Sequence, residues 1–425
     1  MPATEAAVEA VWRIESGRLV GALVRITGDF ATAEDLAQDA LEAALRQWPR
    51  DGVPPNPAGW LMSTARHMAI DRYRRDAVLR RKLPLLAAEV RIEQEWEGPM
   101  SIADRTLDSA VDDDLLRLMF IACHPALTVD SRVALTLRTV GGLQTREIAR
   151  AFLVSETTMG QRIARAKKTL TDQHIALEMP DAGELHSRLA DVLAVIYLIF
   201  NEGYAATVGD DWTRPALCQE ALRLGRILVG LQPDQAEVHG LVALMELQAA
   251  RLAARFDAEG HPVLLADQQR SRWDRLLIQR GLAALQRAED LDGGPYTLQA
   301  AIAACHVRAQ SVDDTDWTRI AALYTVLAFV SPSPVVALNR AIAVGMAEGP
   351  ERGLELLDRL ADEASLERYG QLSAARATFL QALGRIPEAL AEFQRAASLA
   401  DNTDTRTIHL RQAAALTDPD SSETR

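Results

Sequence analysis

Residues 143–170, LQTREIARAFLVSETTMGQRIARAKKTL, predict two short helices joined by a tight turn. Thr145 is a suitable N-cap for the first helix and Ser155 for the second, because a hydroxyl accepts the free backbone N–H groups of a first turn. Apolar residues recur at helical spacing along the second helix and predict one buried stripe. They are Met159, Ile163, Ala166 and Leu170.

The opposite face of this second helix is polar and basic, which suits the base edges and phosphates of DNA. We expect eight residues to contact DNA here: Ser155, Thr157, Thr158, Gln161, Arg162, Arg165, Lys167 and Lys168. The segment predicts a DNA-binding helix-turn-helix. Taken by itself, it also fits an ordinary helical pair with a solvated basic face.

The charge of the chain is unevenly distributed. The net charge is −13, yet residues 1–172 carry 23 basic and 24 acidic side chains, whereas residues 173–425 carry 23 and 35. Within the first part the basic residues cluster at 66–82 and 143–170. Two basic patches can bind phosphates at two places, so an acidic chain is still compatible with a nucleic-acid partner.

Nothing in the sequence points to catalysis, a metal or a membrane. The three cysteines, Cys123, Cys218 and Cys305, form no C-x-x-C pair, and the neighbouring Cys-His pairs at 123–124 and 305–306 are isolated. No nucleophile elbow, glycine-rich phosphate loop or HExxH motif occurs. We therefore expect no enzyme activity, no cofactor, no metal, no membrane contact and a reducing cytoplasmic location.

The N-terminal part predicts two strong helices. Thr32 followed by Asp35 matches a capping box, and Pro49 is expected to end that helix, whose outer face carries acidic and amide groups. The residues of this outer face are Glu34, Asp35, Gln38, Asp39 and Glu42. Asn56 can cap the next helix with Pro57 at its first position.

The remaining chain divides into a linker, a second helical bundle and a long helical tail. Residues 83–111 are acidic and broken by prolines and glycines, which indicates a flexible linker. We place the bundle with the helix-turn-helix at 112–172 and the tail at 173–425. The class is all-α throughout, because alanine, leucine and arginine are abundant.

The tail contains weak internal repeats. Residues 377–396 reproduce the small-residue and aromatic spacing of a tetratricopeptide unit, and 341–360 repeat it 36 residues earlier. A weaker copy places Ala221 twelve residues before Pro233. We expect an α-solenoid that binds protein on its concave face, with a plain helical bundle as the alternative. At 200–204, FNEGY is interpreted as a helix end capped by Gly203 rather than a small-molecule pocket.

Three segments in this order resemble the extracytoplasmic-function (ECF) sigma factors of bacterial RNA polymerase. They are AEDLAQDALEAAL at 33–45, WLMSTARHMAIDRYRR at 60–75 and the helix-turn-helix at 143–170. The resemblance covers about residues 5–172. The tail resembles that of the ECF subgroup with a tetratricopeptide-like extension, as in GPYTLQAAIAACH at 294–306 and PSPVVALNRAIAV at 332–344.

The resemblance implies a role for each segment. Residues 1–82 would be sigma region 2, in which Asp35, Gln38, Asp39 and Glu42 contact the β′ clamp helices of the polymerase core. The minus-ten element would be melted and captured by Trp60, Arg66, His67, Asp71, Arg72, Arg74 and Arg75. His67 departs from the family, which commonly has asparagine there, and Trp60 fits the core as well as a base-stacking role.

Residues 112–172 would be sigma region 4, which reads the minus-thirty-five element, and the acidic linker would thread towards the RNA exit path. The core enzyme, including its β subunit, and promoter DNA would be the partners, with a regulatory protein bound to the repeats. The prediction is a promoter-specificity subunit whose acidic tail regulates it, either by contacting the sigma domains in cis or by binding a signalling partner. The rival is a DNA-binding scaffold that acts through its repeats without binding the polymerase core.

Overall fold

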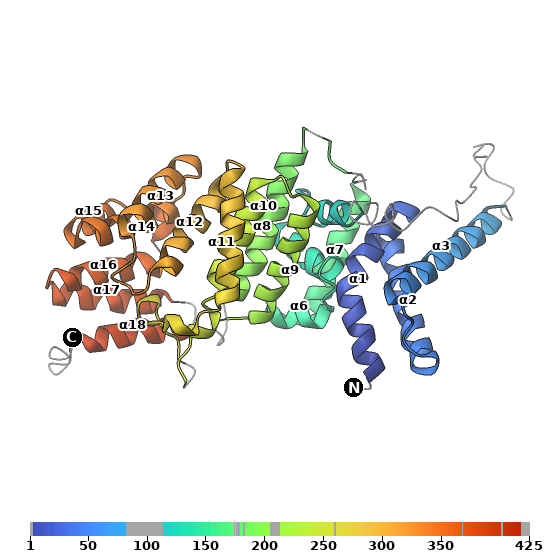
Figure 1. The fold of residues 1–425 in the computed structure, drawn as a ribbon, viewed down its shortest axis with the longest axis horizontal. Coiled ribbons are helices and arrows are strands. Elements are labelled where there is room, and N and C mark those ends of the chain that lie inside the picture. The colour runs from blue at the N-terminus through green and yellow to red at the C-terminus, as the bar shows by residue number, and fades with distance from the viewer. Residues whose placement is uncertain are drawn as a thin grey trace. The chain divides into compact units, whose positions relative to one another are not determined.

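The computed structural model describes residues 3–81, 114–152, 154–173, 175, 179–181, 183–204, 213–258, 261–367, 369–400 and 403–417. In these residues the chain is helical, and the one β feature is an isolated bridge between Phe256 and Pro262. The chain divides into two compact units, residues 1–195 and residues 196–425 (Figure 1). The predicted linker at 83–111 lies outside the described residues.

The first unit begins with three long helices, α1 (Ala3–Thr27), α2 (Phe30–Asp51) and α3 (Pro57–Arg81). Asn56 caps α3 as predicted, because its side chain accepts the Gly59 N–H at 2.9 Å. The predicted start and end of α2 are wrong. Asp29 is the N-cap and accepts the Thr32 N–H at 2.7 Å, and the helix continues through Pro49 to Asp51.

The second helical group contains the helix at 114–122, α5 (Val129–Thr139), α6 (Thr145–Ala151) and α7 (Glu156–Asp172). Ser155 caps α7 and accepts the Thr158 N–H, as predicted. Gln144, not Thr145, is the N-cap of α6, where Glu147 closes a capping box by accepting the Gln144 N–H at 2.7 Å. The predicted stripe of α7 is fully buried, which confirms the helix-turn-helix.

The first unit extends beyond the helix-turn-helix into α8 (Leu185–Tyr204). Arg188 donates to the Phe120 carbonyl at 2.6 Å, and Arg132 of α5 binds Asp191 at 2.9 Å. These two contacts tie the first half of α8 to the helices of the second group. A boundary drawn at residue 172 would therefore separate two arginine contacts from their partners.

The second unit continues with α9 (Pro215–Leu231), α10 (Ala236–Ala249), α11 (Arg275–Asp290) and α12 (Pro295–Arg308). Every residue of α10 from Val238 to Leu247 is buried, so this helix forms the centre of the core. Residues 252–273 interrupt the helical repeat with the short 3-10 turns η1 (Leu252–Ala254), η2 (Leu265–Asp267) and η3 (Arg270–Arg272).

The carboxylate of Glu237 in α10 caps the N-terminus of α12. It accepts the backbone N–H groups of Gly294 at 2.8 Å, Tyr296 at 2.9 Å and Thr297 at 3.2 Å, and the Thr297 hydroxyl at 3.1 Å. An added Cβ on Gly240 would lie 2.6 Å from the Thr297 hydroxyl, so α10 and α12 approach closely here. The segment DGGPYT at 292–297 is thus explained by packing and capping.

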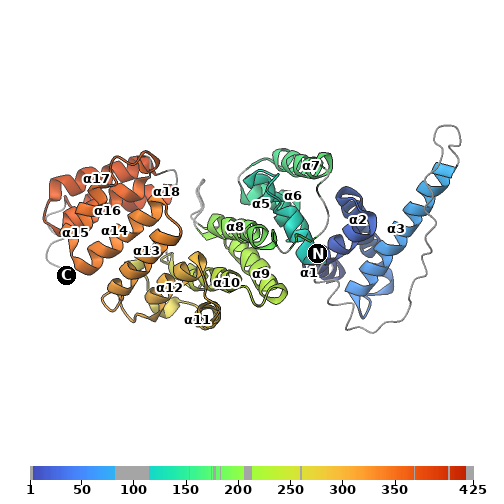
Figure 2. The same ribbon diagram turned by 90° about the horizontal axis from the view of Figure 1, so that it is seen from above.

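The chain then continues as helix after helix: α13 (Trp317–Val330), α14 (Pro334–Glu348), α15 (Pro350–Asp358), the 3-10 turn η4 (Ala364–Leu366), α16 (Gly370–Ala382), α17 (Ile386–Leu399) and α18 (Thr403–Ala415). Successive helices pack on each other, and α14 also contacts α16 (Figure 2).

The tetratricopeptide spacing is confirmed by the helices of the last repeat. Ala377 of α16 and Ala389, Phe393 and Ala396 of α17 are buried, and Gly384 forms the turn between them with a φ of 71°. Phe379 fills the space above Gly345 and Gly353, where an added Cβ would lie 2.3 and 2.4 Å from its ring. Helix pairs stacked in sequence define an α-solenoid of degenerate repeats.

Candidate functional site

The acidic face of α2 is available to a partner. Asp35, Asp39 and Glu42 are exposed and Gln38 is half-buried. Their spacing of three and four residues places all four on one side of the helix. Glu42 accepts a bond from Arg46 at 3.1 Å, and Asp35 lies 4.0 Å from Arg72 of α3. The helix is fixed from the opposite side by buried Phe30, Leu36 and Trp48, among others, so this face is held rigidly.

Glu34 does not belong to this outer face, contrary to the prediction. Only 8% of the residue is exposed, and it shares the buried stripe of α2 with Phe30 and Ala37. Its carboxylate has two cationic neighbours: Arg138 of α5, whose Nε lies 3.4 Å from Oε1, and Lys167 of α7, whose ammonium contacts Oε2. A buried carboxylate at a helix–helix contact needs such partners to offset its desolvation.

The exposed side of α3 carries the residues expected to meet the minus-ten element. Arg66, His67, Asp71, Arg72 and Arg74 are exposed, whereas the side chain of Arg75 is outside the described set. Helical spacing places Trp60, His67, Asp71 and Arg74 on one face. Trp60 is half-buried and meets Trp48 edge-on with ring centroids 5.5 Å apart, so it both packs on α2 and remains accessible to a partner.

The outward side of α7 is a second polar surface. Ser155, Thr157, Thr158, Gln161, Arg165 and Lys168 are exposed. At 100° per residue, Thr157, Gln161, Arg165 and Lys168 lie on the side opposite the buried stripe. The Ser155 hydroxyl lies 2.8 Å from the Thr158 hydroxyl, which orders the first turn of the helix. Thr157, Gln161, Arg165 and Lys168 thus form a row of four exposed polar side chains along α7.

Two of the residues expected to bind DNA lie at the flanks of α7 and have protein partners. Arg162 lies 3.3 Å from Asp130 at the start of α5. Lys167 lies at the other flank against Glu34 of α2, and its side chain is only 24% exposed. The sequence could not separate these two residues from their exposed neighbours, because their partners come from distant segments.

A second ionic contact joins α1 to the helix at 114–122. Asp114 is 1% exposed, and its carboxylate accepts both Arg25 Nε at 3.0 Å and Arg117 Nη1 at 2.6 Å. Two glycines let the backbones approach, since an added Cβ on Gly21 would lie 2.6 Å from the Asp114 carbonyl oxygen and one on Gly17 would lie 2.9 Å from Leu115. This junction was not predicted from the sequence.

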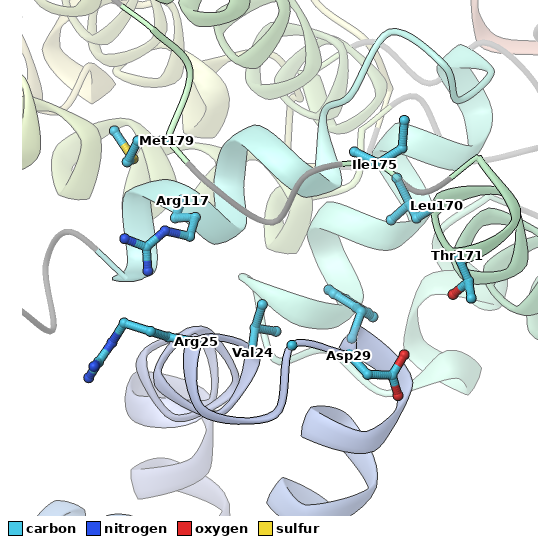
Figure 3. Close-up of a pocket in the computed structure, with 10 residues that line it drawn as sticks. Val24, Arg25, Asp29, Arg117, Leu170, Thr171, Ile175 and Met179 are labelled. Atoms are coloured by element: carbon cyan, nitrogen blue, oxygen red, sulfur yellow. The ribbon is translucent and has the colours of Figure 1, made fainter. Parts of the chain in front are cut away.

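A cavity of about 550 Å³ opens beside this junction. Its walls come from the turn between α1 and α2, from the end of α7 and from Ile175 and Met179 beyond it. Figure 3 shows Arg25, Arg117 and Met179 at one end and Leu170, Thr171 and Ile175 at the other. The cavity is lined by both helical groups of the first unit, so its shape depends on their contact.

The cysteines are inert packing residues in this structure. All three are free thiols and buried, and burial raises the pKa of Cys123 and of Cys218 to about 12. Cys123 lies 3.4 Å from the Thr136 hydroxyl. Across the described part of the chain, no three histidine, cysteine or acidic side chains are arranged to hold a metal ion, and no helix is long and apolar enough to cross a membrane.

FNEGY is the last turn of α8, as predicted, but Gly203 is not its C-cap, because the helix continues to Tyr204. Gly203 lies inside α8, and an added Cβ would lie 2.6 Å from the Cys218 backbone nitrogen. The glycine is therefore required by the close packing of α8 on α9. The neighbouring Glu202 binds Arg214 just before α9, so the segment is a helix–helix junction.

Three family models match the chain, and two of them cover the helices that carry the polar surfaces. Sigma-70 region 2 matches residues 13–78, which contain α2 and most of α3, and sigma-70 region 4 matches residues 117–170, which contain α5, α6 and most of α7. Residues 188–289 match a family of unknown function, DUF6596. Region 2 followed by region 4 on an all-helical chain defines a sigma-70-type protein, a class of non-catalytic transcription factors.

Similar proteins carry the classification further. "Uncharacterized protein R00370" of Rhizobium meliloti is 44% identical over 384 residues, 90% of this chain and 89% of that protein. The "Probable ECF RNA polymerase sigma factor SigI" of Mycobacterium tuberculosis is 27% identical over 41% of this chain and 58% of its own length. The "Probable RNA polymerase sigma factor RfaY" of Xanthomonas campestris is 30% identical over 35% of each chain.

The chain thus carries both regions of the sigma-70 family, is similar to ECF sigma factors over these regions, and has a C-terminal helical extension beyond them. Among solved structures, yeast Tom70 aligns with 91% of this chain and 80% of its own at 13% identity and a TM-score of 0.30.

Proposed function

We propose that the chain directs core RNA polymerase to promoters with defined minus-ten and minus-thirty-five elements and helps to open the DNA, while the polymerase supplies the chemistry. Residues 1–82 act as region 2, 83–111 as the linker, 112–172 as region 4 and 173–425 as the regulatory extension. As in the rest of the family, the place of action is the cytoplasm.

One observation carries this proposal: α2, α3 and α7 each leave exposed the face that the family uses. Asp35 and Asp39 are exposed on a helix whose other sides are packed, which suits a rigid docking surface for the β′ clamp helices. The exposed cations of α3 and α7 belong to two different helical groups of the first unit, which suits two separate DNA elements. Arg165 and Lys168 supply cations for base or phosphate contacts on α7.

The direct test is reconstitution of the purified chain with bacterial core RNA polymerase, scored by complex formation and by run-off transcription from the gene's own upstream region. Asp35→Arg with Asp39→Arg should abolish core binding, because two repulsive charges replace two attractive ones on the docking face. The matched control is Glu289→Arg with Asp313→Arg, which reverses two exposed acids of the second unit. Equal transcription by both double variants would refute the proposal.

We propose further that the extension regulates the sigma regions by binding a protein partner. The support is its acidic charge, with 35 acidic and 23 basic side chains at 173–425, and its solenoid of helix pairs, an architecture that presents an extended binding surface. A chain ending at Tyr204 keeps α8 whole, and with it Arg188 and Asp191. Unchanged promoter activity of this shortened chain, in cells and in vitro, would refute the regulatory role.

A further inference from the structure

We propose that Glu34 is a clasp that holds α7 on α2 through Lys167 and Arg138, so that Lys167 has two mutually exclusive partners. In the free chain the partner is Glu34. In the promoter complex it is a DNA phosphate, a part of the inference that rests on the proposed function. The free chain is therefore closed between region 2 and region 4 and must open before it reads a whole promoter.

The charges at the clasp favour closure. The side chains of Glu34, Lys167 and Arg138 are 11%, 24% and 18% exposed, so all three are largely removed from water. Ion pairs of this kind are screened far less by salt than surface pairs. Neutralising the acid would leave two nearby cations without their shared counter-charge, and this favours separation of α7 from α2.

The steric fit points in the same direction. Region 2 and region 4 also meet where Gly17 and Gly21 of α1 lie against residues 114, 115 and 140. Any side chain on Gly21 would press on the Asp114 carbonyl oxygen, a backbone atom that cannot rotate away. Asp114 itself is held by Arg25 across the same contact. The two regions are thus fitted to each other in shape as well as in charge.

The closed arrangement is incompatible with simultaneous reading of both promoter elements. Their names place them about 25 base pairs apart, which is about 85 Å along B-form DNA at 3.4 Å per pair. The reading helix α3 has 25 residues and is about 37 Å long. It packs on α2, and α2 contacts Lys167 of α7 directly. The two reading surfaces lie too close together to span the promoter until α7 leaves α2.

Closure leaves the polymerase-docking face free. Asp35 and Asp39 are exposed while their neighbour Glu34 is engaged, because successive residues of a helix point about 100° apart. The core enzyme can thus bind the closed chain through one side of α2. Opening is a separate step, and the release of Lys167 couples it to DNA binding.

The test measures the distance between region 2 and region 4 in the full-length free chain by single-molecule Förster resonance energy transfer. Dyes are placed on Gln47→Cys of α2 and Arg150→Cys of α6, both of which are exposed. The native thiols are buried, so the label goes to the two new cysteines. The wild-type background should show one predominant high-transfer population.

Two unrelated changes should open the chain. Glu34→Gln removes the charge at constant size, and Gly21→Ala inserts a methyl group while favouring the helix that contains it. Each should raise the ratio of open to closed molecules about 10-fold, the scale expected for loss of one partly buried contact. The controls are Glu15→Gln, whose ion pair with Arg18 stays within α1, and Gly230→Ala, where the new methyl meets no atom within 4 Å.

If neither Glu34→Gln nor Gly21→Ala changes the distribution of energy-transfer efficiencies, the clasp is refuted. A further arm adds core RNA polymerase and promoter DNA to the labelled wild-type chain and should lower the transfer. If the two variants open the free chain but polymerase with promoter does not, the clasp stands and the proposed function fails. If polymerase and promoter lower the transfer while both variants behave as their controls, the proposed function stands and the clasp is refuted.

Discussion

Replacing Glu237 tests whether the DGGPYT segment is structural. Glu237→Ala would remove one carboxylate that accepts three backbone N–H groups and one hydroxyl at the beginning of α12. Hydrogen bonds to a charged group contribute about 1.5–3 kcal/mol each, but bonds that share one acceptor are not additive and water can reach this half-buried site. The carboxylate also interacts favourably with the helix dipole. We therefore expect Glu237→Ala to lower the free energy of opening of α12 by about 3 kcal/mol.

The assay is amide hydrogen exchange of the full-length chain, read by mass spectrometry for peptides from Pro295–Arg308. A loss of about 3 kcal/mol corresponds to exchange about 150-fold faster, because 1.4 kcal/mol is a factor of ten. Peptides from α2 serve as the internal reference. Glu237→Gln should have about half the effect, since the amide oxygen can keep the bonds made by Oε1 while the amide nitrogen opposes the Tyr296 N–H.

The matched control for this prediction is Glu289→Ala, which removes an exposed carboxylate from α11 in the same unit. It should leave exchange in α12 unchanged. Exchange in α12 that rises less than threefold in both Glu237 variants would show that the carboxylate does not hold the helix. The segment would then need an explanation other than capping, such as contact with a partner.

Other predictions concern pH, DNA and thiols. Burial near two arginines lowers the pKa of His306 to about 4, so its neutral form is the native one, and acidifying from pH 7.5 to 5 should cost the second unit about 2 kcal/mol. His306→Gln should remove this slope in thermal unfolding curves. Arg165→Ala should weaken binding to a minus-thirty-five duplex by about 1–3 kcal/mol with loss of sequence preference, whereas Lys168→Ala should weaken all duplexes equally in fluorescence anisotropy titrations. Iodoacetamide at pH 8 should leave Cys123 and Cys218 unmodified in the folded chain and alkylate both after unfolding, as read by intact mass.

Periodicity was sufficient to predict the elements whose partners are local. The buried stripe of α7 and its Ser155 cap follow from residues three and four apart, and both are confirmed. The helix–turn–helix spacing around Gly384 is likewise a local pattern. Helix ends were predicted less well, because Asp29 competes with Thr32 as a cap and a proline near a helix end can remain inside the last turn.

Contacts between distant segments could not be read from the sequence. Glu34 was assigned to the outer face because acids are usually exposed, although its position three residues before Ala37 and four after Phe30 places it in the buried stripe. Its partners Arg138 and Lys167 lie more than a hundred residues away. Gly203 was misassigned for the same reason, since the backbone of α9 that requires a glycine follows in a later segment.

The one-after-another packing of α13 to α18 has a consequence for how this extension can change during evolution. Because each helix pair rests mainly on its neighbours, a pair can be gained, lost or given a new outer surface without rebuilding a shared centre. Region 2 and region 4 are constrained by their fit to each other and, under the proposed function, by their fit to polymerase and to DNA. Under the proposed function, such a change in the extension would alter the input that it receives and would leave the two promoter-reading regions as they are.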